Sequence, residues 1–346
     1  MTPVMLSMLL LNMTLGTIIT LTSSHWLLAW AGLEINTLAI IPIISKQHHP
    51  RATEAATKYF LTQATASAVV LFASSMNAWK TGQWDITQTT LPESTMMLTL
   101  ALAMKLGLAP FHFWMPEVLQ GSTLLTATII STWQKLAPTI LLYLNIDNLN
   151  KPILMGLGLF SALIGGWQGL NQTQTRKIMA FSSIAHMGWM FMALTISPNI
   201  TLLTICIYMI TSTAMFTALM MTSSKTLLDL GTSWPGTPTL LMTSLMTLMS
   251  LGGLPPLTGF MPKWLILKEL VQNNLTLISI MMALSTLPSL FFYLRMSHVT
   301  TLTLSPETTN TKHKWRFKTP NMPLILPSII LTNLMLPITP LMMNLC

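Results

Sequence analysis

The stretches GLAPFHFWMPE, residues 107–117, and GLPPLTGFMPK, residues 253–263, decide the fold of this chain of 346 residues. Each one interrupts a long apolar segment, and they begin 146 residues apart (253 minus 107). Proline removes a backbone N–H, so within lipid the freed carbonyls must be satisfied by the protein or by water. Paired breaks in two halves are typical of transporters, and both breaks are predicted to line a polar path. The matching residues are Gly107 and Gly253, Leu108 and Leu254, Pro110 and Pro256, Met115 and Met261, and Pro116 and Pro262.

The composition places the chain in a membrane. Hydrophobic residues make up 51% and charged residues only 8%, whereas about a quarter of the residues of a soluble protein are charged. The pattern predicts an all-α polytopic membrane protein with about eleven transmembrane helices, because the apolar runs are long enough to cross roughly 30 Å of hydrocarbon. The runs lie near 2–22, 25–45, 56–78, 95–115, 122–145, 152–170, 175–195, 200–222, 238–260, 275–295 and 322–345.

The two breaks predict an internal repeat within one membrane domain, residues 1–346. An odd number of helices separates them, so they run in opposite directions, as in transporters built from two inverted repeats of five helices. The predicted repeats cover 1–147 and 148–300, followed by a polar loop at 301–321 and a last transmembrane helix at 322–346. The alternative is a chance likeness between two proline-kinked helices.

Basic residues concentrate in alternate loops, although the net charge of +8 alone is also compatible with nucleic-acid binding. They are not clustered on one soluble face, so no nucleic-acid partner is expected. By the positive-inside rule the N-terminus lies on the matrix or cytoplasmic side and the C-terminus across the membrane. The loop 301–321 is predicted to touch lipid headgroups or a partner subunit. The positive side carries Lys46, Arg51, Lys58, Arg176, Lys177, Lys225, Arg295, Lys312, Lys314, Arg316 and Lys318, and the other side Lys80, Lys151 and Lys268.

The two cysteines, Cys206 and Cys346, permit neither a disulfide framework nor an iron–sulfur site of four thiolates. No nucleotide, hydrolase or metal motif occurs in a suitable context. We therefore expect no redox cofactor and no metal in this chain. The first apolar run lacks a basic n-region, so no cleavable presequence is expected. The high Met content, with abundant Leu and Thr and little Cys, is typical of mitochondrially encoded proteins.

Four charged residues fall inside apolar segments: Glu34, Lys105, Lys135 and Lys263. A lysine at the helix centre costs about 2.5–3.5 kcal/mol on the insertion scale, so each one needs an interior partner or a wet cavity. The functional interpretation is a set of groups that gain and lose protons. The alternatives are structural ion pairs involving Glu34 and Lys135, and lysines that only extend to the interface, most readily Lys263.

Two internal histidines, His112 and His186, are candidate proton relays. The alternative for both is a neutral histidine that donates to a carbonyl, and for His112 this is the favoured interpretation. The hydroxyls of Ser182, Ser183 and Thr258 either extend a wet path or bond back to their own helices. Packing or interfacial anchoring accounts for Trp26, Trp114, Trp189 and Trp264.

Four long stretches carry a resemblance to a known family. They resemble the antiporter-like, mitochondrially encoded membrane subunits of NADH–ubiquinone oxidoreductase, respiratory complex I, and most closely its chain 2 family. The resemblance covers essentially the whole chain, although longer bacterial relatives begin with three additional helices. The stretches are WLLAWAGLEINTLAIIP at 26–42, KLGLAPFHFWMPEV at 105–118, GLNQTQTRKIMAFSSIAHMGWM at 169–190 and SLGGLPPLTGFMPKW at 250–264.

The resemblance implies a function that composition alone does not. It implies proton translocation across the mitochondrial inner membrane, with the N-terminus in the matrix, driven by electron transfer from NADH to ubiquinone in other subunits. NADH, FMN, iron–sulfur clusters and ubiquinone are then expected in those subunits. The implied partners are other complex I subunits, especially neighbouring antiporter-like ones, and lipids such as cardiolipin. The four family charges fall on Glu34, Lys105, Lys135 and Lys263.

The sequence predicts a mechanism in which Glu34 and Lys105 form a coupled pair and separation of the pair drives the lysine's proton onward. The proton then passes through Lys135 and water toward Lys263. Two other functions stay open: a stand-alone cation/proton antiporter, and a structural membrane subunit without its own proton path.

Overall fold

The computed structural model describes residues 2–234, 237–301, 316 and 325–340. Regular structure in this part of the chain is helical, apart from two isolated β-bridges, so the all-helical prediction is confirmed. Most of the predicted polar loop 301–321 lies outside the described residues, as do both ends of the predicted last helix 322–346.

The chain divides into two compact units, Met1–Ser161 and Ala162–Cys346. The first unit holds α1 (Pro3–Thr22), α2 (Trp26–Ile44), η1 (Ser45–Gln47), α3 (Pro50–Thr81), η2 (Ile86–Gln88), α4 (Pro92–Leu106), α5 (Trp114–Gly121), α6 (Leu124–Ser131), α7 (Trp133–Leu144), η3 (Ile146–Asn148) and the start of α8 (Lys151–Gly169). The second holds the end of α8, α9 (Thr175–Ile196), α10 (Pro198–Thr222), α11 (Leu227–Thr232), α12 (Pro238–Gly252), α13 (Phe260–Gln272), α14 (Thr276–Thr301), α16 (Ile325–Leu334) and η5 (Leu336–Ile338).

Long apolar helices occur together with interrupted ones. Within the described residues, seven helices are long and apolar enough to cross a membrane: α1, α2, α3, α8, α9, α10 and α14. Three other predicted runs contain an interruption: 95–115, where α4 ends at Leu106, 122–145, which divides between α6 and α7, and 238–260, where α12 ends at Gly252. The described part of the last run is α16. The prediction of a continuous helix fails at Thr132, whose φ of −112° and ψ of −75° separate α6 from α7.

The two broken segments have the same local geometry. Gly107 and Gly253 follow the ends of α4 and α12 with φ of 74° and 79°, a region that favours glycine. The next N–H in each reaches back to the helix, from Leu108 to the Ala103 carbonyl at 3.0 Å and from Leu254 to the Met249 carbonyl at 3.2 Å. Each phrase also contains a cis X-Pro bond. The helices after the breaks, α5 and α13, begin at the same offset of 146 residues (260 minus 114).

Within each unit, two loops contact each other that the predicted set of transmembrane helices places on the same side of the membrane. In the first unit His25 bridges Asp85, so the α1–α2 connection contacts the α3–α4 connection. In the second, Gln174 bridges Thr226, between the α8–α9 and α10–α11 connections. Each pair of connections is separated by two helices, and alternate crossing of the membrane requires such connections to share a side.

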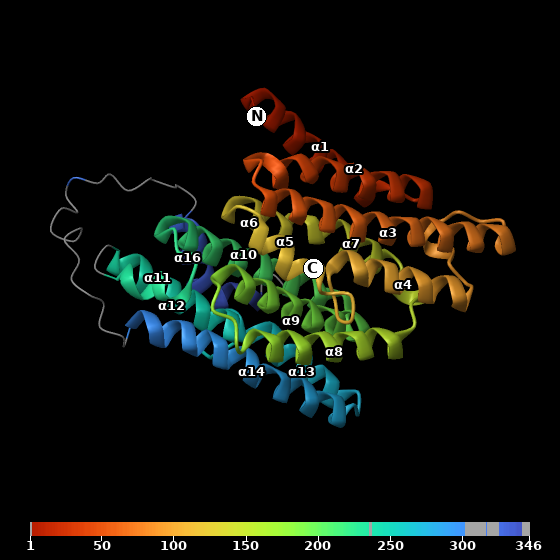
Figure 1. Ribbon diagram of the computed structural model, residues 1–346. Coiled ribbons are helices and arrows are strands. Elements are labelled where there is room, and N and C mark those ends of the chain that lie inside the picture. The colour runs from red at the N-terminus through yellow and green to blue at the C-terminus, as the bar shows by residue number, and fades with distance from the viewer. Residues whose placement is uncertain (1, 235–236, 302–315, 317–324, 341–346) are drawn as a thin grey trace. The chain divides into compact units, whose positions relative to one another are not determined.

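Close packing of α1 on α2 depends on two glycines. A Cβ added at Gly32 would lie 2.7 Å from Thr20 Cγ2 and 2.8 Å from the Gly16 carbonyl oxygen. A Cβ at Gly16 would lie 2.7 Å from Asn36 Oδ1. Small residues let membrane helices approach closely, where packing replaces the hydrophobic effect as the source of association. In the first unit α1, α2 and α3 accordingly run side by side (Figure 1).

We expect Gly32→Ala to destabilise the first unit by about 1–3 kcal/mol, because the added methyl group overpacks this contact. Gly156→Ala is the matched control, since a Cβ added to that α8 glycine meets no atom within 4 Å. Thermal unfolding of both variants followed by tryptophan fluorescence tests the prediction. Equal midpoints for the two variants would contradict it.

Candidate functional site

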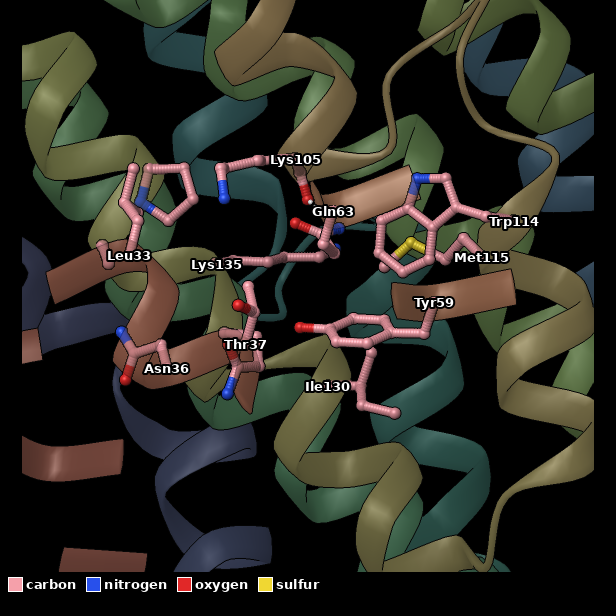
Figure 2. Close-up of a pocket in the computed structure, with 13 residues that line it drawn as sticks. Leu33, Asn36, Thr37, Tyr59, Gln63, Lys105, Trp114, Met115, Ile130 and Lys135 are labelled. Carbon is pink, nitrogen blue, oxygen red and sulfur yellow. Dashed lines mark hydrogen bonds between the residues drawn. The ribbon is translucent and has the colours of Figure 1, made fainter. Parts of the chain in front are cut away.

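The first unit contains a cavity with polar and charged lining residues, built by every helix from α2 to α7 (Figure 2). The centre of a water molecule can occupy a volume of ≈ 20 Å³ in this cavity. The cavity therefore has room for about one water molecule. In Figure 2 the Lys105 amine points into the space beside Lys135, and the Tyr59 hydroxyl points toward Thr37. The lining residues are Leu33, Asn36, Thr37, Tyr59, Gln63, Lys105, Trp114, Met115, Ile130, Gln134, Lys135, Ala137 and Pro138.

Lys105 enters this cavity from the last turn of α4, directly before the first break. Its side chain is 5% exposed, and its amine makes no hydrogen bond to the described residues. The carbonyls released near the break are bonded instead: Gln63 Nε2 donates to the Lys105 carbonyl at 3.3 Å, and Trp114 Nε1 donates to the Met104 carbonyl at 3.2 Å. A helix C-terminus carries partial negative charge. Lys105 therefore lies at the negative end of the α4 dipole.

Lys135 enters from the first turn of α7, just after the interruption at Thr132. It is 4% exposed, and Pro138 lies three residues further along the same helix. A helix N-terminus carries partial positive charge, which opposes a cation there. The two lysines of one cavity thus lie at helix ends of opposite polarity. The interaction free energy of a charge with one helix end is roughly 0.3–2 kcal/mol.

Glu34 lies on α2 next to this cavity and does not line it. Its half-buried carboxylate accepts hydrogen bonds from the Ser67 hydroxyl and, at 3.0 Å, from the Thr37 hydroxyl. The ion pairs among the described residues do not join Glu34 to Lys105; they join Lys58 with Glu54 and Glu117, and Lys80 with Glu93. Leu33, next to Glu34, and Thr37, one turn further along α2, nevertheless line the cavity that holds Lys105.

The second unit contains cavities around Lys263. This residue is 9% exposed, lies in α13, and lines two neighbouring cavities together with His186 and Trp189. Its amine donates to the Gly252 carbonyl at 2.8 Å and to the Leu251 carbonyl at 3.4 Å. It also lies 6.0 Å from the Trp189 ring centroid, within reach of a cation–π contact. Lys263 therefore caps the end of α12 at the second break.

The remaining sequence candidates have separate locations. His112 is 2% exposed and lies in the first break against Phe113, but it lines none of these three cavities. Ser182 and Ser183 bond back to carbonyls of their own helix. Thr258 donates to the carbonyl of Thr332 in α16. Trp26, Trp114 and Trp189 are buried in packing, and Trp264 is exposed.

Buried polar residues on α3 accompany the charged groups and were not among the residues predicted from the sequence. Tyr59, Gln63 and Ser67 are spaced four residues apart on α3 and are all buried. Residues at this spacing share one helix face, so a polar stripe in an apolar helix was the available signal. Asn36 and Gln134 join them from α2 and α7 as buried amides with atoms that lack a hydrogen-bond partner among the described residues. The described residues contain no group of three or more His, Cys, Asp or Glu placed to hold a metal ion.

Comparison with known proteins identifies relatives over the whole length. Residues 23–288 match the NADH:quinone oxidoreductase/Mrp antiporter transmembrane family, and residues 290–343 match the C-terminal region of NADH dehydrogenase subunit 2. The NADH-ubiquinone oxidoreductase chain 2 of Xenopus laevis is 54% identical over 99% of both chains. That of Carassius auratus is also 54% identical, over 100% of this chain and 99% of its own.

Solved structures share the fold. A chain of respiratory complex I from Thermus thermophilus with bound aureothin superposes with a TM-score of 0.87 at 26% identity, covering 98% of this chain and 79% of that one. A chain of the Mrp complex from Dietzia superposes with a TM-score of 0.84 at 16% identity, over 97% and 76% respectively. The second likeness concerns the fold alone.

We expect Gly253→Ala to displace the Lys263 amine, because the new Cβ would lie 2.7 Å from Lys263 Cδ and 2.9 Å from Nζ. Gly107→Ala is the matched control. It has the same left-handed backbone, but its Cβ would meet Met115 Sδ at 3.0 Å. Labelling of Lys263 by a small membrane-permeant amine reagent, quantified by mass spectrometry, should be roughly fivefold faster in Gly253→Ala, the equivalent of about one hydrogen bond. Equal labelling in both variants would show that Gly253 does not position the lysine.

Proposed function

This chain belongs to the NADH-ubiquinone oxidoreductase chain 2 family, the antiporter-like membrane subunits of respiratory complex I, and from that premise we propose that protons pass through its buried-lysine cavities. The single observation that carries the proposal is the pairing of Lys105 and Lys135 in one cavity, at helix ends of opposite polarity. Proton movement there is driven by electron transfer from NADH to ubiquinone in other subunits. NADH, FMN, iron–sulfur clusters and ubiquinone belong to those subunits under this proposal.

Glu34 sets the charge near Lys105. An ionised carboxylate stabilises a protonated amine through space, and the attraction falls when the carboxylate becomes neutral. Lys105 then transfers its proton by way of water to Lys135, whose position at a helix N-terminus makes onward release easier. Moving one charge against about 100 mV requires roughly 2.3 kcal/mol. Helix-end effects of up to about 2 kcal/mol, together with the Glu34 charge, are of the right size.

In the second unit, His186 and Lys263 are the proposed proton-carrying groups, as Lys105 and Lys135 are in the first. Both line the same two cavities, and the lysine is held at the carbonyl end of a broken helix. Under this proposal His186 is a relay for a proton carried by Lys263. His112 lies outside both cavities, and its proposed role is secondary to that of His186.

We place the protein across the mitochondrial inner membrane with about eleven crossings, its N-terminus in the matrix and its C-terminus in the intermembrane space. The proposed repeats are residues 1–147 and 148–300, inverted relative to each other, with a matrix-side loop and a last helix. Support comes from the equal geometry of the two breaks and from the contacts between alternate loops. Neighbouring antiporter-like subunits and anionic lipids such as cardiolipin are the proposed partners of its exposed apolar and basic surfaces.

Lys105→Met should lower the number of protons translocated per NADH oxidised, because methionine keeps the side-chain length and loses the amine. The measurement uses intact complex I reconstituted in sealed vesicles, with electron transfer recorded in parallel. Lys80→Met is the control, since Lys80 is exposed and pairs with Glu93 at the surface. An unchanged ratio in Lys105→Met with assembly intact would assign the buried lysine a structural role and refute the proposed path.

A further inference from the structure

The carboxylate of Glu34 lies between two hydroxyl groups from different helices. Ser67 of α3 contacts Oε1, and Thr37, one turn further along α2, lies 3.0 Å from Oε2. Both hydroxyl side chains are buried. Each carboxylate oxygen therefore has a polar neighbour of its own, although no lysine amine lies within ion-pair distance of Glu34 among the described contacts.

Each of these hydroxyls has one proton and two acceptors within reach. Ser67 Oγ lies 2.9 Å from the Ala64 carbonyl as well as against Glu34 Oε1. Thr37 Oγ1 lies 2.9 Å from the Glu34 main-chain carbonyl as well as near Oε2. A hydroxyl donates once and accepts through its lone pairs. Both hydroxyls can thus donate to the carboxylate or, by rotation of the O–H bond alone, donate back to their own helices.

These two arrangements match the two protonation states of the acid. When Glu34 is ionised, both hydroxyls donate to it. When Glu34 gains a proton, its new O–H donates to Ser67 Oγ, and Ser67 donates to the Ala64 carbonyl. One proton is added to the carboxylate and no covalent bond is broken, because the hydrogen bond between Ser67 and Glu34 only reverses its direction. Every polar atom stays paired in both states, which avoids the cost of an unsatisfied buried group.

The other charged and titratable groups near Glu34 come from several helices. α1 packs against α2 and carries none between Pro3 and Thr22. α3 contributes Tyr59, α4 contributes Lys105, and α7 contributes Lys135 to the adjoining cavity. Lys46 in η1 is exposed beyond the far end of α2. A change in the charge of Glu34 therefore takes place beside the cavity that Tyr59, Lys105 and Lys135 line.

We propose that Ser67, assisted by Thr37, is a positioning residue that lets Glu34 take up and release a proton in place, so that the charge acting on Lys105 is switched without movement of the carboxylate. This inference rests on the proposed function of Lys105. It differs from a mechanism in which Glu34 and Lys105 must meet and separate as an ion pair. The Ser67 hydroxyl is a hydrogen-bond donor to ionised Glu34 and an acceptor from protonated Glu34.

The test uses intact complex I carrying Ser67→Ala, with Ser74→Ala as the matched control. Ser74 is buried on the same helix, and among the described residues its hydroxyl bonds only to the Leu71 carbonyl. Infrared difference spectra between reduced and oxidised complex record the carboxylic acid C=O band, and Glu34→Gln identifies the band of Glu34 by its loss. Ser67→Ala should shift that band to higher frequency and lower NADH-driven proton translocation about tenfold, while Ser74→Ala changes neither. Ser67→Thr, which keeps the hydroxyl, should restore both.

The outcomes separate this inference from the proposed function. If Lys105→Met lowers the proton ratio but Ser67→Ala leaves the Glu34 band and the translocation rate unchanged, the path stands and the role of Ser67 is refuted. If Glu34→Gln removes no band, Glu34 does not take up a proton during turnover, and the inference fails. Equal losses in Ser67→Ala and Ser67→Thr would reveal a packing defect and would also overturn it.

Discussion

The requirement that every main-chain polar group be satisfied inside a membrane governs this structure. Helices α4 and α12 both end within apolar runs, at Gly107 and Gly253. The carbonyls at these ends are bonded by side chains that arrive from elsewhere, the Gln63 amide at the first break and the Lys263 amine at the second. A broken helix thus leaves carbonyl groups that need hydrogen-bond donors. The side chains that donate to them are polar or charged groups in the protein interior.

The two breaks meet this requirement in different ways. At the first, neutral donors from Gln63 and Trp114 occupy the released carbonyls, and the Lys105 amine is left facing the cavity. At the second, the lysine itself is the donor, with Gly253 leaving the space that its chain occupies. The same backbone motif therefore leaves one lysine facing a cavity and fixes another at a helix end. Lys105 precedes its glycine by two residues and Lys263 follows its glycine by ten, so the two lysines occupy different positions relative to the motif.

Helix α3 organises the first unit. One face of it carries Tyr59 against Trp114, Gln63 against the end of α4, and Ser67 against Glu34. In the N-terminal part of α3, Lys58 pairs with Glu117 of α5 at 2.6 Å. Because these contacts lie on one rigid element, the carboxylate, the broken helix and the short helix after it keep a defined geometry. Proton transfer between buried groups requires that surrounding residues hold those groups in a fixed geometry.

Composition, run length and the paired phrases were enough to predict a helical membrane protein and the location of its two breaks, because hydrocarbon thickness and the missing N–H of proline act locally. Glu34, Lys105, Lys135 and Lys263 could be selected from the sequence because a charge in an apolar run is costly wherever the chain folds. The break at Thr132, the capping by Lys263 and the contact of Glu34 with Ser67 were not predictable in this way. Each depends on which helix faces fall opposite one another, and only tertiary packing decides that.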